Sequence, residues 1–178
     1  MRRVLEIKLS RVQTDQTELR DFVQHAISGL EGNERTALTS IRSVAEEALS
    51  IAWESEFPGS AIPPEAQKQL TVPWKQGGAG IDWQDFQALS NPNVRRKILR
   101  LAAGAEGRPK LTKGVSRPLM LLIEHLHKVG DYGQHMRDWP VEQEAPVDFE
   151  FCVSACLSAM ALLKRLSEDL VRPELATA

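Results

Sequence analysis

The sequence predicts an all-α protein, an antiparallel bundle of four to five helices with a long irregular loop between the second helix and the later ones. Apolar residues recur at helical spacing in one segment after another. No stretch alternates apolar and polar residues over the length of a strand. The five Phe, four Trp and one Tyr leave a core made mainly of Leu, Ala, Ile and Val, a composition that favours helices.

The first 53 residues predict two or three helices. Residues 5–30 carry an i, i+3, i+4 stripe of apolar side chains, which indicates one amphipathic helix or two joined near residues 14–17. A further helix is expected from about residue 34 to residue 53, where Arg42 and Glu46 lie one turn apart and can form an ion pair. Gly32 and Asn33 indicate a turn between the segment 5–30 and the helix that follows it. We therefore expect residues 1–33 to form an N-terminal amphipathic segment and residues 34–178 to form the bundle domain.

Proline and glycine interrupt the pattern over residues 57–80 and leave room for at most a short helix near residues 65–70. A loop of this length is either functional or mobile. Its glycine cluster at residues 77–80 has no strand before it and no Gly-Lys-Ser/Thr ending, so a phosphate-binding loop is not expected there.

Four more helices are expected, over residues 83–89, 93–103, 116–127 and 148–170. Ser116 and Asp148 are the expected N-caps of the last two, and Asn93 that of the second. Gly130 and Gly133 are expected to end or kink the helix that contains the histidines, and Arg172-Pro173 to close the last helix. The last helix carries both cysteines, Cys152 and Cys156, which are expected to be reduced core residues because i, i+4 positions on a helix are poorly placed to bridge.

The net charge of -2 hides an uneven distribution. Residues 138–150 are acidic, whereas the middle of the chain carries a basic group that is a candidate nucleic-acid-binding surface: Arg95, Arg96, Arg100, Arg108, Lys110, Lys113 and Arg117. Such a group is either a solvated surface or a surface that meets phosphate or an acidic partner. The chain has no run of about 20 apolar residues and no pattern of a signal peptide, so we expect a cytoplasmic protein without a membrane partner.

Residues 125–135 hold three of the four histidines and the only tyrosine. His125 and His127 do not share one face of a helix, so no metal site is expected, and no cofactor motif is present. His135 is the best candidate for acid–base chemistry, because an imidazole titrates near neutral pH, and Lys128 could stabilise negative charge nearby. A structural role for His135 at a helix junction is the alternative.

The run from Lys128 through Asp131 to His135 resembles the motif of the HEPN superfamily. In that superfamily an arginine, followed after four to six residues by a histidine, stands at the end of a long bundle helix, and a helix rich in small residues follows. The resemblance covers roughly residues 34–170. It implies a homodimer whose two motifs face each other, and in active members a metal-independent RNA cleavage in which the histidine assists attack by the ribose 2'-hydroxyl. Such members occur among toxins and antiviral defence proteins.

This chain departs from that motif at two positions. Lys128 stands where arginine is expected, and Val129 stands where a polar residue is usual. Lysine keeps the positive charge but lacks the bidentate fork that suits phosphate. We therefore favour a non-catalytic, dimeric HEPN-like module that binds a partner protein or nucleic acid in a defence or regulatory system. The alternative is a metal-independent ribonuclease in which Lys128 and Asp131 support His135 and the basic region guides the RNA backbone.

Overall fold

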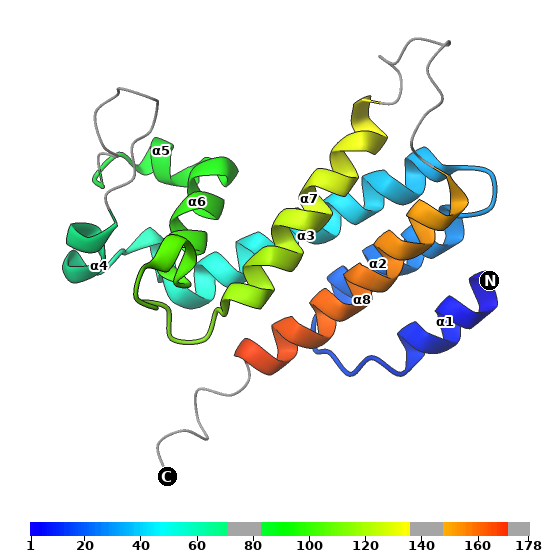
Figure 1. Ribbon diagram of the computed structural model, residues 1–178, viewed down its shortest axis with the longest axis horizontal. Helices are drawn as coiled ribbons and strands as arrows, with labels where there is room; N and C mark the ends of the chain where they lie inside the picture. The colour runs from blue at the N-terminus through cyan, green and yellow to red at the C-terminus, as the bar shows by residue number, and fades with distance from the viewer. Residues whose placement is uncertain (71–82, 136–147, 171–178) are drawn as a thin grey trace. The chain divides into compact units, whose positions relative to one another are not determined.

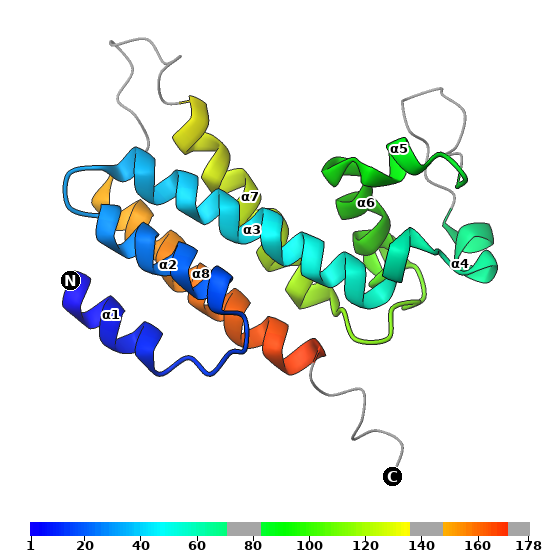
Figure 2. The same ribbon diagram turned by 180° about the vertical axis from the view of Figure 1, so that it is seen from behind.

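The computed structural model describes residues 1–70, 83–135 and 148–170. All regular structure within these residues is helical, which confirms the predicted all-α class (Figures 1 and 2). The α-helices are α1 (Arg2–Ser10), α2 (Thr17–Gly29), α3 (Glu34–Glu56), α4 (Pro64–Gln69), α5 (Phe86–Ser90), α6 (Pro92–Ala102), α7 (Arg117–His135) and α8 (Phe149–Leu170). Short 3-10 helices occupy Pro58–Ser60 and Ala105–Gly107.

The chain forms two compact units. Unit 1 comprises Met1–Ala48 and Leu121–Glu168, and unit 2 comprises Leu49–Met120 and the residues from Asp169 onward. Each of the two long helices α3 and α7 contributes residues to both units. The expected division of the chain after residue 33 stays a prediction, because compact units reflect contacts and not independent folding.

Unit 1 is built from α1, α2, the first part of α3, most of α7 and nearly all of α8. The apolar stripe of residues 5–30 forms two helices, and not one, because polar residues occupy positions 13–17 and the Thr14 hydroxyl accepts a turn hydrogen bond from the Gln16 N–H at 3.1 Å. Both views show α1 beside α2 (Figures 1 and 2). Leu5 and Leu9 are buried, so the inner face of α1 belongs to the core.

The helix that carries the histidines does not end at Gly130 or Gly133, so the predicted end there is wrong, whereas the alternative of a kink stays a prediction. Ser116 caps α7 as expected, with its hydroxyl accepting from Leu119 N–H at 3.3 Å, but the helix continues to His135. The two glycines lie where α7 touches α3: a Cβ on Gly130 would lie 2.7 Å from the Arg42 Cα, and one on Gly133 would lie 2.6 Å from the Leu38 Cβ. These glycines therefore permit close helix packing and do not stop the helix.

The last helix begins as predicted, with the Asp148 carboxylate accepting from Phe151 N–H at 2.7 Å. Both cysteines are free and buried on its inner face, which confirms the prediction for them. Its expected closing residues, Arg172 and Pro173, lie outside the described residues.

Burial makes both thiols hard to ionise. It raises the pKa of Cys152 to about 11 and that of Cys156 to about 12, from an ordinary value of 9.0. Because the thiolate is the reactive form, we expect a thiol reagent at pH 8 to label the folded protein about 100-fold more slowly than the protein in urea. Because the pKa of each thiol is higher in the folded than in the unfolded chain, the protonated thiols favour the folded state below pH 9.0. Their contribution to the free energy of unfolding should decrease as the pH rises towards the folded-state pKa values. Labelling of the folded protein at the unfolded rate would contradict this prediction.

Unit 2 contains the short helices and a carboxylate, Glu56, that binds three backbone N–H groups and is named here the anchor. Helix α4 confirms the short helix predicted near residues 65–70, whereas residues 71–82 lie outside the described residues. Helix α6 is capped by Asn91, whose side chain accepts from Asn93 N–H at 2.9 Å, so the cap predicted at Asn93 is displaced by two positions. The anchor is the Glu56 carboxylate, which accepts from three consecutive backbone N–H groups: Lys113 at 2.8 Å, Gly114 at 2.7 Å and Val115 at 2.6 Å.

Candidate functional site

A polar cluster joins α3 to α7 within unit 1. The Asp131 carboxylate forms an ion pair with the Arg42 guanidinium, and its other oxygen lies 3.5 Å from the His127 Nδ1. On the other side, Arg42 Nε donates to Glu46 Oε1 at 2.7 Å, which confirms the predicted pair. The cluster is half-buried, with side-chain exposures of 21% for Arg42, 13% for His127 and 39% for Asp131. Asp131 is therefore held against α3 by its ion pair with Arg42.

Sequence reasoning did not find the Arg42–Asp131 pair, because the two residues are 89 positions apart. One local signal for it exists. Gly130 and Gly133 are spaced i, i+3 on a helix next to Asp131, a pattern that permits two helix backbones to come close together.

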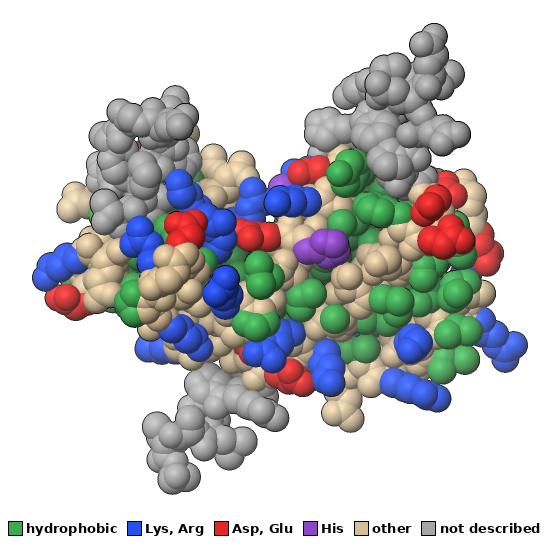
Figure 3. All heavy atoms as spheres, viewed as in Figure 1, with side chains coloured by type: hydrophobic (Ala, Val, Ile, Leu, Met, Phe, Trp, Pro, Cys, Tyr) green, Lys and Arg blue, Asp and Glu red, His purple; other side chains and the backbone are tan. Residues whose placement is uncertain are grey.

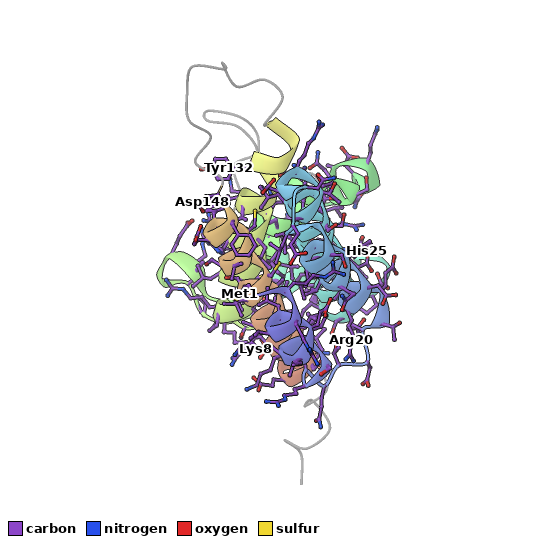
Figure 4. All side chains as sticks on the ribbon, turned by 90° about the vertical axis from the view of Figure 1, so that its right-hand side faces the viewer. Met1, Lys8, Arg20, His25, Tyr132 and Asp148 are labelled. Carbon is purple, nitrogen blue, oxygen red and sulfur yellow. The ribbon has the colours of Figure 1, made fainter. Side chains whose placement is uncertain are left out.

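The outer side of α7 carries a line of exposed side chains. Leu121, His125, Lys128 and Tyr132 are all exposed and follow one another at spacings of four, three and four residues. At about 100° per residue these positions lie within about 60° of one another, so they form one stripe, named here the α7 stripe. Figure 4 shows Tyr132 and Asp148 together on one side of unit 1, and the Tyr132 ring meets the Phe151 ring edge-on at 5.8 Å between centroids.

The structure directs two of the three predicted catalytic residues, Lys128 and Asp131, to different surroundings. Lys128 is exposed in the α7 stripe, whereas Asp131 points to α3. His135 is the last residue of α7 and not part of a loop, and its side chain lies outside the described residues. Lys128 and His135 are seven positions apart, so their backbones lie on the same side of the helix but about 10 Å apart along its axis.

The predicted basic surface belongs to unit 2: Arg95, Arg96, Arg100, Arg108, Lys110, Lys113 and Arg117. Much of it makes local contacts. Arg95 donates to the Leu89 carbonyl at 2.7 Å and lies over the Trp53 ring, 5.2 Å from its centroid. Arg100 pairs with Glu106 at 2.6 Å. Arg95 is therefore chiefly a structural residue, which the sequence did not reveal.

Two other cations of this group also make local hydrogen bonds, and three are exposed. Arg108 donates to the Gln69 carbonyl at 2.8 Å, and Arg96 to the Asn93 side chain at 2.7 Å. Lys110, Lys113 and Arg117 are exposed. Figure 3 shows that Lys and Arg side chains gather over unit 2. They supply a positive field for this unit.

A shallow cavity of about 450 Å³ opens along the first turns of α3, lined by Asn33, Arg35, Thr36, Thr39 and Ser40. Two of its polar side chains are already used locally: the Asn33 side chain accepts from Thr36 N–H at 3.1 Å, and the Thr39 hydroxyl donates to the Arg35 carbonyl at 2.9 Å. The cavity is lined by polar residues and open to solvent, and sequence reasoning gave no sign of it.

Within residues 1–70, 83–135 and 148–170, no group of three or more His, Cys, Asp or Glu side chains could hold a metal ion. None of the helices in the described part of the chain is long and apolar enough to cross a membrane. Comparisons of the chain with protein-family models, with curated proteins and with solved structures find no match.

Proposed function

We propose that this chain is a non-catalytic, dimeric HEPN-like helical module that binds nucleic acid through the α7 stripe, in a defence or regulatory system. The observation that carries the proposal is the arrangement of α7. An exposed lysine, histidine and tyrosine line one side of it, while the Asp131 carboxylate is held by Arg42 of α3.

The chemistry of the stripe suits a single-stranded nucleic acid. The Lys128 ammonium can contact phosphate, and the Tyr132 ring, which is 39% exposed, offers a face or edge to a base. His125 lies one turn before Lys128 and adds a hydrogen-bond donor. The exposed cations of unit 2 increase the general attraction of the chain for polyanions.

The geometry gives little support to catalysis by a single chain. General acid–base catalysis needs its groups within hydrogen-bond reach of one reacting centre. Lys128 and the backbone of His135 are about two helical turns apart, and the Asp131 carboxylate is paired with Arg42. Lysine also lacks the bidentate fork with which arginine would hold a phosphate.

The proposal is tested by fluorescence anisotropy with a labelled 20-nucleotide single-stranded RNA of mixed sequence, in low salt and EDTA. We expect binding without cleavage, and we expect Lys128→Glu to weaken it at least about tenfold because the substitution reverses a charge at the contact. The matched control is Lys8→Glu, since Lys8 is an exposed lysine on α1 of the same unit. The control should change the affinity less than about twofold.

Two outcomes would replace the proposal. Absence of binding to single-stranded RNA, single-stranded DNA and duplex RNA would point to a partner protein. Cleavage of the RNA in EDTA, reduced at least about 100-fold in His135→Ala, would establish the ribonuclease alternative. One observation favours that alternative: Lys128 and the backbone of His135 share a side of α7, so a second copy could bring its lysine to this histidine.

A further inference from the structure

Helix α8 presents a second straight line of exposed residues. Its exposed positions are Glu150, Ser154, Leu157, Ala161 and Lys164. Their spacings are four, three, four and three residues, the seven-residue repeat with which one helix packs along another. We name this line the α8 stripe. Leu157 lies at its centre and is 41% exposed, whereas the opposite face of the helix is core.

The charges of the α8 stripe are complementary to those of a second copy that runs antiparallel to it. Glu150 and Lys164 each lie seven residues from Leu157, at about 10 Å on either side of it. A two-fold axis through Leu157 places Glu150 of each copy opposite Lys164 of the other, which gives an attractive pair at both ends. A parallel arrangement would instead place like charges opposite each other. Within the described residues Lys164 makes a long ion pair with Glu168, at 3.8 Å.

The residues between the centre and the ends are small. Ser154 and Ala161 flank Leu157. In the antiparallel arrangement Ser154 of one copy faces Ala161 of the other, so the two helix axes could approach to about 8 Å there. Figure 3 shows acidic side chains over the start of α8 and hydrophobic side chains along it. Shape and charge along the stripe both favour an antiparallel partner of the same sequence.

We propose that the α8 stripe docks a second copy of this chain, with the two α8 helices antiparallel and Leu157 on the two-fold axis. The inference rests on the dimer of the proposed function and specifies its contact. Such a seam is shorter than a standard protein–protein interface, so the dimer should have a micromolar dissociation constant.

Cysteine cross-linking tests the two-fold axis directly. A disulfide requires the two Cα atoms to lie within about 7 Å, and only a residue on the axis meets its own copy at that distance. We expect oxidised Leu157→Cys to become a covalent dimer, and Ser154→Cys alone to stay monomeric because its two copies lie about 9 Å apart along the seam. The double variant Ser154→Cys/Ala161→Cys should cross-link again. The native cysteines are buried and should not contribute, so the unmodified chain is the background control.

Two results would overturn the arrangement. Cross-linking of Ser154→Cys alone would show a parallel pair. A dimer seen by analytical ultracentrifugation without cross-linking of Leu157→Cys would place the contact on another surface.

Charge exchange provides an independent test by sedimentation. Glu150→Lys places lysine opposite Lys164 at both ends and should weaken the dimer about tenfold, and Glu150→Lys/Lys164→Glu should restore it. Glu18→Lys makes the same charge change at an exposed position on α2 and should have little effect. Equal effects of Glu150→Lys and Glu18→Lys would count against the α8 stripe.

RNA binding separates this inference from the proposed function. Cross-linking of Leu157→Cys in a protein that binds no nucleic acid would support the α8 contact and contradict the proposed ligand. A monomer that does not cross-link but binds RNA through Lys128 would contradict the α8 contact and leave the ligand in place.

Discussion

Replacing Gly130 with alanine should lower the free energy of unfolding by about 2 kcal/mol. The new Cβ would lie 2.7 Å from the Arg42 Cα and 2.8 Å from its backbone nitrogen, distances at which α3 and α7 must move apart. Overpacking of this kind costs about 1–3 kcal/mol, and more where the neighbour is backbone, since backbone cannot rotate out of the way. Alanine recovers about 1 kcal/mol through its higher helix propensity. The measurement is urea unfolding followed by circular dichroism.

Gly29→Ala is a graded control, because its Cβ would lie 3.0 Å from the Ala37 nitrogen and needs a smaller shift. His125→Ala is the control on α7 itself, since His125 is exposed and its replacement changes only local helix propensity. If Gly130→Ala were as stable as the original chain or more stable, helix propensity would dominate. The close contact between α3 and α7 would then not exist in solution.

The same contact explains where sequence reasoning succeeded and where it failed. The beginnings of α7 and α8 were predictable because their caps, Ser116 and Asp148, act on backbone groups three residues away. The end of α7 was not, because a glycine that breaks an isolated helix is tolerated where a second helix packs against it. Gly130 meets Arg42, which is 88 positions earlier in the chain, and no local pattern contains that contact.

The candidate site shows the same division between local and distant information. The spacing of Arg42 and Glu46 predicted their pair, because both lie on one helix. The partner of Asp131 required the fold. Arg95 looked like a surface cation in the sequence, yet its contacts with Leu89 and Trp53 depend on how α6 packs within unit 2. Charge alone does not distinguish a side chain that binds a ligand from one that holds its own protein together.

Replacing Glu56 with alanine should destabilise the protein by about 2–3 kcal/mol. Glu56 is the last residue of α3, and its carboxylate accepts from the N–H groups of Lys113, Gly114 and Val115 at 2.6–2.8 Å. Hydrogen bonds to a charged group are the stronger ones, and their loss leaves three converging donors that only water can satisfy. The measurement is again the free energy of unfolding in urea.

The amide variant should divide this effect between geometry and charge. In Glu56→Gln one oxygen can still accept from Gly114 and Val115, but an NH2 group then faces the N–H of Lys113 and the negative charge is lost. Its destabilisation should therefore fall between zero and that of Glu56→Ala.

Glu54→Gln is the matched control, because Glu54 is exposed and accepts a single backbone bond, from Gly59 at 3.1 Å. If Glu56→Ala cost no more than Glu54→Gln, this carboxylate would not tie the end of α3 to the segment that leads into α7. Native-state hydrogen exchange at Lys113, Gly114 and Val115 would then be unchanged, whereas loss of the anchor should speed it selectively at these three amides.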